Sequence, residues 1–209
     1  MVKEVDLGEK GAASLSIVTT KHTAPSCTRK RLAGEVVITW KTWSGYFLGV
    51  KDRFVFFDAS DGTNGGMGFA VFDSATSAKL FEDVRLGELE FEQTSGQPVT
   101  LRYRRMEDPE CSLLTDPDAC WDKIKKLLGD DVAKPDCRKG YEKSAHDLAK
   151  GRCEAQGKAD PDCMARELKL ATEQTSQATS IIAYPVERIL GPKPAIRNVA
   201  GATQCWPSD

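Results

Sequence analysis

The chain has 209 residues, of which 40% are hydrophobic and 29% are charged, as in an ordinary globular protein. Its 29 basic and 31 acidic residues leave a net charge of −2, so no overall field would recruit nucleic acid or anionic lipid. No apolar run approaches the roughly 18–20 residues that a bilayer-spanning helix requires. We therefore expect neither a nucleic-acid partner nor a transmembrane segment.

The first residues predict no regular structure. Residues 1–13 are polar and contain glycine, so we expect them to be loosely held. They also lack the apolar core of a signal peptide. If the protein is exported, we expect Met1 to follow a removed leader. A lipid anchor lost with that leader is an equally open alternative.

The next segment combines a strand with a basic loop. Ser14–Thr20 is rich in β-branched residues and predicts a strand. The loop that follows carries a basic cluster, Arg29, Lys30 and Arg31, which could contact a phosphate or a carboxylate. Such a cluster is more often a solvated loop, and its three residues stay candidates for partner binding.

A strand is predicted at Glu35–Trp40, and Trp43 follows it closely. Two tryptophans three residues apart could line a sugar- or peptide-binding surface. The favoured interpretation is that Trp40 packs in the core while Trp43 covers the sheet edge, because buried aromatic side chains dominate core energetics. Trp43 joins the basic cluster as a candidate for partner binding.

The stretch from residue 46 to residue 103 predicts an antiparallel β-meander. Its candidate strands are 46–50, 53–58, 68–73, 79–82, 89–93 and 99–103. The run Arg53–Asp58 is apolar on both faces, so we expect this strand to be central and covered on both sides.

The last hairpin of the meander carries alternating charges. We expect Glu90 to face Arg102 and Glu88 to face Arg104, so that ion pairs line the solvated face. Acid–base chemistry by these carboxylates is the less favoured alternative.

The segment Asp58–Gly66 is dense in turn-forming residues. Asp58, Asp61 and Asn64 offer the oxygen atoms that calcium prefers. The segment lacks the ligand order and the distal glutamate of an EF-hand. Asp, Asn and Gly are also the residues that a β-turn requires, so we predict a turn, with calcium binding as the weaker alternative.

Apolar residues beyond the meander repeat with a helical period. Three helices are predicted, over about 116–129, 136–151 and 160–177. Asp116–Pro117 and Asp160–Pro161 each combine an N-cap residue with proline at the first helical position, and Gly129 ends the first helix.

Seven cysteines are present, and all but Cys27 lie in the second half of the chain. None forms the C-x-x-C pair typical of zinc or thioredoxin-like sites, which favours disulfides in an oxidising compartment over a reduced cytosolic protein. We predict Cys111–Cys120 and Cys153–Cys163 as local disulfides. A third, Cys27–Cys205, would leave Cys137 unpaired.

The C-terminal part returns to β structure. Ser180–Leu190 predicts a strand, and Pro185 within it indicates an edge position or a break into two strands. Gly191–Asp209 is expected to be an extended tail that residues 205–207 pin to the body.

The predicted fold is therefore α+β, a mainly antiparallel β-meander sheet with a three-helix, disulfide-stapled insertion before a C-terminal strand. We expect a single domain over residues 1–209. Its β-meander region, helical insertion and C-terminal strand with tail are predicted at 14–105, 106–178 and 179–209.

Catalytic and cofactor motifs are missing from the sequence. It contains two histidines, no G-x-S-x-G around a serine and no Walker loop, and we expect no cofactor or metal centre. A glycosidase-like hydrolase that uses only carboxylates stays open, because two acids need no fixed spacing.

These exclusions favour a non-enzymatic, exported protein, periplasmic or secreted, that recognises a protein or glycan partner in a bacterial envelope setting. An inhibitor or immunity-type protein that blocks an enzyme is the alternative. A long unprotected sheet edge would favour an acceptor of a partner strand, whereas a rigid protruding loop with a charged tip would favour an inhibitor.

Overall fold

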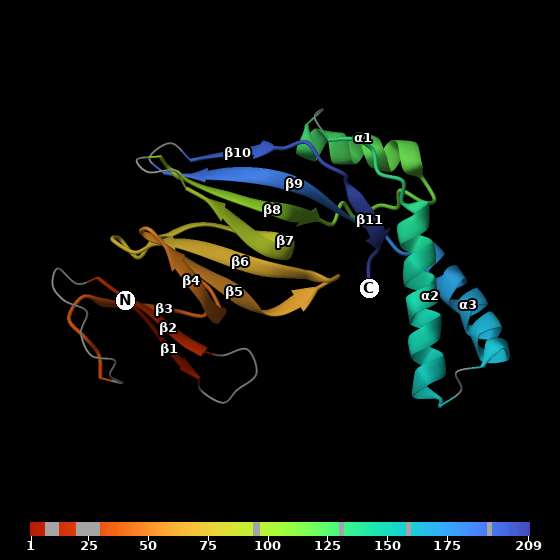
Figure 1. Cartoon of the computed structure of the whole chain (residues 1–209), viewed down its shortest axis with the longest axis horizontal. Helices are drawn as coiled ribbons and strands as arrows, with labels where there is room; N and C mark the ends of the chain where they lie inside the picture. Colours follow the sequence, from red (N-terminus) through yellow and green to blue (C-terminus); the bar gives the residue numbers. More distant parts are fainter. Residues whose placement is uncertain (7–12, 20–29, 94–96, 130–131, 158–159, 192–193) are drawn as a thin grey trace. The chain divides into compact units, whose positions relative to one another are not determined.

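The computed structural model describes residues 1–6, 13–19, 30–93, 97–129, 132–157, 160–191 and 194–209. Strands come first along the chain, three helices follow, and three further strands end it (Figure 1). The strands are β1 (Val2–Asp6), β2 (Ala13–Val18), β3 (Glu35–Ile38), β4 (Gly45–Lys51), β5 (Phe54–Thr63), β6 (Gly66–Asp73), β7 (Lys79–Glu92), β8 (Val99–Glu107), β9 (Ser180–Leu190), β10 (Ala195–Asn198) and β11 (Gln204–Pro207), and the helices are α1 (Pro117–Leu128), α2 (Arg138–Ala155) and α3 (Pro161–Ser176).

The described strands form two sheets. One has three strands in the order β1-β2-β3, and the other has eight, in the order β10-β9-β8-β7-β6-β5-β4 with β11 added beside β9. The predicted α+β class, antiparallel sheet and helical insertion before the C-terminal strands are therefore confirmed.

The chain divides into two compact units. Unit 1 comprises Met1–Glu88 and Gln93–Val99, and unit 2 comprises Leu89–Glu92 and Thr100–Asp209. The single domain expected from the sequence stays a prediction, and each unit is described by itself.

The core of unit 1 lies between the three-stranded sheet and one face of β5 and β6. Strand side chains alternate between faces, so Val55 and Phe57 of β5 face this core together with Phe72 of β6. Phe54 and Phe56 point to the opposite face and are also buried. The expectation that both faces are covered is confirmed, whereas the expected central position is wrong, because β5 lies next to the terminal strand β4.

Residues 2–6 form β1, so the expectation that the first residues are loosely held is wrong for them; residues 7–12 lie outside the described residues. β1 pairs with β2, and the Lys3 ammonium lies 2.9 Å from the Glu35 carboxylate of β3. Both side chains of this ion pair are buried. A polar segment is ordered here by a partner 32 residues away, which no local pattern reveals.

The turn between β5 and β6 is tighter than predicted. β5 continues to Thr63, β6 begins at Gly66, and the pairing shifts register between Asp58 and Gly62. Asn64 and Gly65 both have positive φ, at 53° and 79°. This is the two-residue type I′ geometry that Asn-Gly favours.

β7 is one strand of 14 residues, although the sequence predicts two short ones. In unit 2, Arg102 of β8 binds Glu92 of β7 at 2.9 Å, while the expected positions of Glu90 opposite Arg102 and of Glu88 opposite Arg104 stay predictions. Arg102 also binds Glu187 of β9 at 2.9 Å, and Glu187 accepts a hydrogen bond from Arg197 of β10 at 2.9 Å. Alternating charges therefore join four strands, β7 to β10.

Two of the three helices have the predicted boundaries, and α2 extends beyond the predicted end at Gly151. The Asp160 side chain caps α3 by accepting a hydrogen bond from the backbone of Cys163 at 2.8 Å. Helices α2 and α3 run antiparallel, side by side (Figure 1), around the small buried residues Ala145, Ala149 and Ala171.

Three disulfides join described cysteines, and all of them lie in unit 2. Cys111–Cys120 and Cys153–Cys163 are confirmed. The predicted Cys27–Cys205 bond is wrong because Cys205 bonds to Cys137; Cys27 lies outside the described residues. β11 pairs with β9, which brings Cys205 beside the residue that precedes α2.

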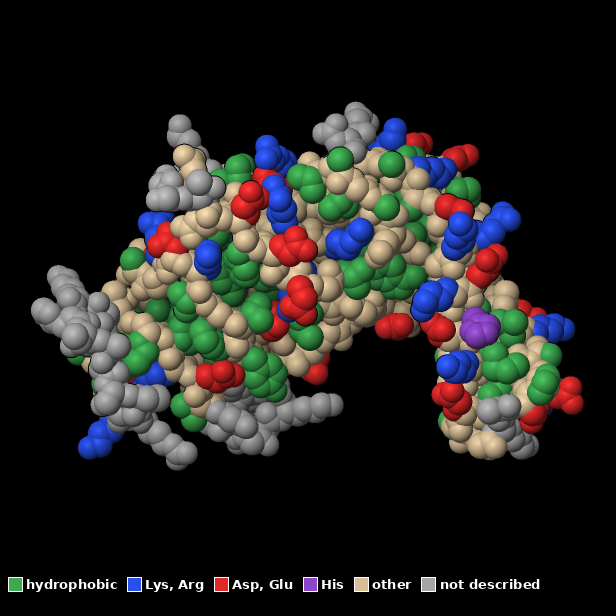
Figure 2. All heavy atoms as spheres, viewed as in Figure 1, with side chains coloured by type: hydrophobic (Ala, Val, Ile, Leu, Met, Phe, Trp, Pro, Cys, Tyr) green, Lys and Arg blue, Asp and Glu red, His purple; other side chains and the backbone are tan. Residues whose placement is uncertain are grey.

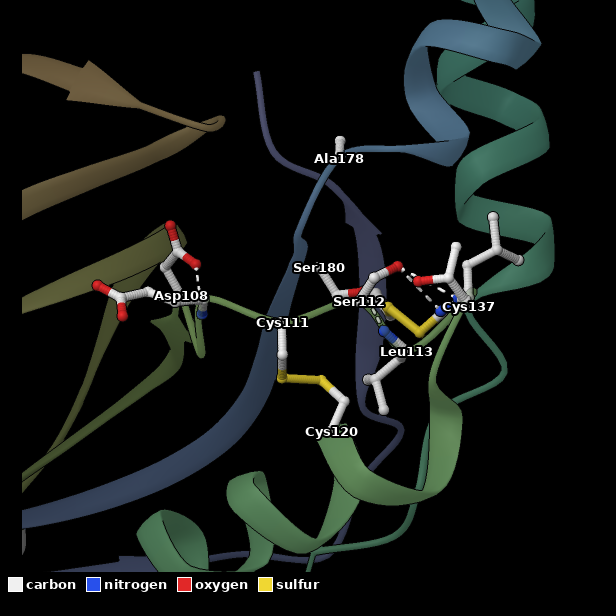
Figure 3. The surroundings of a disulfide bond; sticks show 12 residues. Asp108, Cys111, Ser112, Leu113, Cys120, Cys137, Ala178 and Ser180 are labelled. Carbon is white, nitrogen blue, oxygen red and sulfur yellow. Dashed lines mark hydrogen bonds between the residues drawn. A yellow bond between two sulfur atoms is a disulfide. The ribbon is translucent and has the colours of Figure 1, made fainter.

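A buried polar network anchors the start of β9 near the disulfides. The Tyr141 hydroxyl of α2 donates to the Ala178 carbonyl at 3.1 Å and lies 2.9 Å from the Ser180 hydroxyl oxygen. Ser180 also accepts a hydrogen bond from the backbone N–H of Leu113 at 2.8 Å (Figure 3). The network joins α2, β9 and the segment that carries Cys111.

Pro185 neither ends β9 nor places it at an edge, so that expectation is wrong. One side of β9 pairs with β11 over residues 180–183 and with β10 over residues 186–189. Pro185 falls between these two partners, where its missing N–H costs no ladder hydrogen bond. Its carbonyl accepts from the backbone of Val199 at 3.1 Å. The prediction that the tail is pinned to the body is confirmed.

The contact between α2 and β11 generates a prediction with an internal control. A Cβ added at Gly140 would lie 1.8 Å from the Cys205 carbonyl oxygen, whereas one added at Gly151 meets nothing within 4 Å. Gly140→Ala should lower the free energy of unfolding by about 1–3 kcal/mol, because β11 must move. Gly151→Ala should raise it by about 0.5–1 kcal/mol, because alanine favours the helix. Urea unfolding without reductant measures the free energy of unfolding of both variants. Equal changes in the two variants would contradict the close approach of Gly140 to β11.

The Lys3–Glu35 ion pair makes the stability of the fold depend on pH in the acidic range. Hydrogen bonds from Lys3 and from the backbone of Leu32 lower the pKa of Glu35 from 4.5 to about 2. Because the carboxylate of Glu35 is favoured in the folded state, the ion pair stabilises the fold fully at pH values above the ordinary glutamate pKa of 4.5. This stabilisation is lost as the pH falls from about 4.5 to about 2.

Glu35→Gln should therefore be less stable than the native protein at neutral pH and should lose less stability across that acid window. Urea unfolding at several pH values measures the difference. Glu4→Gln, at an exposed position of β1, is the matched control and should keep the native pH profile. An unchanged profile for Glu35→Gln would show that the ion pair does not form.

Candidate functional site

The candidate site of unit 1 is the outer edge of β4. This strand is last in the order of its sheet and pairs only with β5 among the described residues. Four of its apolar side chains, those of Tyr46, Phe47, Leu48 and Val50, are 38–54% exposed. Hydrophobic side chains gather over the part of unit 1 that contains β4 (Figure 2). An exposed, apolar edge strand is a template for pairing with another chain.

The exposure of β4 follows from its position and its pairing. Phe47 pairs with Phe57 and Val50 pairs with Val55, so both point to the core side of the sheet. At the terminal strand this face is only partly covered, and Val50 remains 54% exposed.

A register shift between Phe47 and Gly49 leaves Leu48 as an extra residue, which marks a β-bulge. The edge therefore offers two short runs, residues 45–47 and 49–51. The bulge and Lys51 are both features that limit uncontrolled edge pairing.

The two tryptophans differ in exposure, and the structure contradicts the expectation for Trp40 alone. Trp43 packs against the core of unit 1 and donates its indole N–H to the Asp58 carbonyl at 3.2 Å. Trp40 is 78% exposed, with the Lys41 ammonium 5.6 Å from its ring centroid. The expectation that Trp40 packs in the core is wrong. Trp40 is the tryptophan that is open to a partner.

The described residues of the basic cluster precede β3, whereas Trp43 follows β3 and packs against the core of unit 1. The Lys30 carbonyl accepts a hydrogen bond from the Lys3 ammonium at 3.0 Å, and Arg31 is exposed. Arg29 lies outside the described residues. The partner-binding role of these residues stays a prediction.

The three calcium candidates lie at different points of the β5–β6 hairpin, and calcium binding by them stays an untested alternative. Asp58 lies within β5 and accepts hydrogen bonds from the Arg85 guanidinium at 2.9 and 3.0 Å, which neutralise its charge. Asp61 is exposed near the end of the same strand, and Asn64 occupies the turn. No group of three or more His, Cys, Asp or Glu side chains that could hold a metal occurs in the described part of the chain.

Two acidic side chains, those of Glu187 and Asp147, have pKa values that neighbouring basic residues lower, so both are held as charged hydrogen-bond acceptors. Hydrogen bonds from Arg102 and Arg197 hold the pKa of Glu187 below its ordinary value, and Lys143 does the same for Asp147. A catalytic general acid requires a shift in the opposite direction. The Arg-bound Glu187 is thus suited to joining strands and unsuited to donating a proton.

Sequence reasoning missed β4 as an edge. The run from Tyr46 to Val50 is apolar without alternation, a pattern that also fits a strand buried on both faces. Its place in the sheet order, which depends on pairings distant in sequence, distinguishes the two possibilities.

None of the described helices is both long enough and apolar enough to cross a bilayer. No protein-family model, curated protein or solved structure matches the chain.

Proposed function

We propose that this is a non-enzymatic, exported binding protein that accepts an extended segment of a partner protein along β4. The observation that carries the proposal is the combination of a terminal strand position with exposed apolar side chains. Main-chain hydrogen bonds would supply affinity, and alternate side chains would supply specificity.

The chemistry of β4 defines the partner segment. It should be extended and short, because the bulge at Leu48 divides the edge into two runs. It should carry apolar residues opposite Phe47 and Val50 and little charge, because burying an unpaired charge there would be costly. Trp40 provides a further exposed aromatic surface in the same unit.

Export is supported by the three disulfides, which fit an extracellular-type protein. The periplasm and the extracellular medium both satisfy this chemistry. The non-enzymatic part of the proposal rests on the catalytic motifs that the sequence lacks.

A charge placed on the edge should block binding. Val50→Lys is expected to weaken the affinity for a β4-binding peptide by about tenfold or more, because lysine would have to be desolvated against the added strand. Leu127→Lys is the matched control, since Leu127 is a similarly exposed apolar residue, on α1 of unit 2. It should bind with native affinity.

The probe is a displayed library of linear peptides of about ten residues with alternating apolar positions. Isotope-edited NMR on the full chain should show the selected peptide shifting β4 amides and protecting them from exchange. A library without a β4-dependent binder, or a peptide that binds Val50→Lys with native affinity, would refute the proposal.

A further inference from the structure

Unit 2 contains an open pocket of about 500 Å³ between α2, the end of α3 and the residues around β11. Its volume lies within the range of ordinary ligand sites. None of its lining residues belongs to β4 or to unit 1, so it is separate from the strand-binding edge.

One part of the pocket wall is apolar and firmly held. Trp206 and Pro207 line it from β11, and Leu148 lines it from α2. Trp206 pairs with Ile181 of β9, and the neighbouring Cys205 is bonded to Cys137. The backbone that carries Trp206 is therefore held in place before a ligand arrives, which reduces the entropy lost on binding.

The polar part consists of neutral groups whose partners orient them. Gln174 accepts a hydrogen bond from Arg152 through Oε1 at 2.6 Å, so its amide NH₂ is the group that can donate into the pocket. The Ser208 hydroxyl oxygen accepts from Thr179 at 2.9 Å, which leaves the Ser208 hydroxyl proton to donate. Ser144 adds a third neutral group from α2.

The charge of the lining narrows the ligand class. The described lining residues include no Lys, Arg or His, although the Arg152 guanidinium reaches the lining Gln174 at 2.6 Å. Asp209 is the acidic member of the lining and can accept hydrogen bonds from hydroxyl groups. An aromatic surface beside neutral donors and one acceptor suits a ligand with an apolar face and several hydroxyls.

We propose that this pocket binds a neutral saccharide unit, with the C–H face of the sugar ring against Trp206 and its hydroxyls bound by Ser144, Gln174 and Ser208. Desolvated hydroxyls need both donors and acceptors, and the lining supplies both. The inference does not depend on strand binding at β4.

The experiment titrates the isotope-labelled full chain with glucose, N-acetylglucosamine and cellobiose, with glucosamine and glucuronate as charged analogues. At least one neutral sugar should shift the Trp206 indole and Gln174 side-chain amide signals with a Kd on the order of 1 mM. Absence of shifts from every neutral sugar at about 50 mM would overturn the proposal. Preferential binding of a charged analogue would also overturn it, since charge would then dominate recognition.

Two variants and a control locate the site. Gln174→Ala and Ser144→Ala should each weaken binding at least about fivefold, because each removes a polar contact. Ser176→Ala lies on α3 outside the pocket lining and should keep native affinity. Native affinity in both pocket variants would place the sugar elsewhere. Val50→Lys should bind the sugar like the native protein, which separates this test from that of β4.

Discussion

The disulfide between Cys137 and Cys205 is the constraint on which unit 2 depends. It joins residues 68 positions apart and holds β11 against the beginning of α2. Closing a loop of this length removes on the order of 4 kcal/mol of unfolded-state entropy on the chain-entropy model. The same contact fixes the close approach of Gly140 to the Cys205 carbonyl and places Trp206 and Pro207 in the pocket wall.

Unit 1 has a corresponding constraint in the buried ion pair between Lys3 and Glu35. It ties β1 to β3 across β2 and completes the three-stranded sheet that covers the core face of β5 and β6. Removing one partner would leave a buried charge uncompensated. β4 stays at the end of the larger sheet, so its apolar side chains remain exposed.

The charged residues of the two units contribute mainly to architecture. Glu187 joins β8, β9 and β10 through two arginines, and Asp58 binds Arg85 within unit 1. The two proposed recognition surfaces, the β4 edge in one unit and the pocket in the other, consist mostly of uncharged residues, with Asp209 as the acidic member of the pocket lining. Protein and saccharide recognition would then coexist in one chain without sharing residues.

Elements with local signals could be predicted from the sequence alone. Asp160 and Pro161 marked the start of α3, β-branched and apolar residues marked β9, and short spacing marked Cys111–Cys120. Three features became visible only in the folded chain: the pairing of Cys137 with Cys205, the ordering of β1 by Lys3 and the edge position of β4. Each of these depends on a partner distant in the chain. Periodicity and capping report the preferences of neighbouring residues, whereas strand order and the convergence of α2 and β11 depend on the free energy of the whole fold.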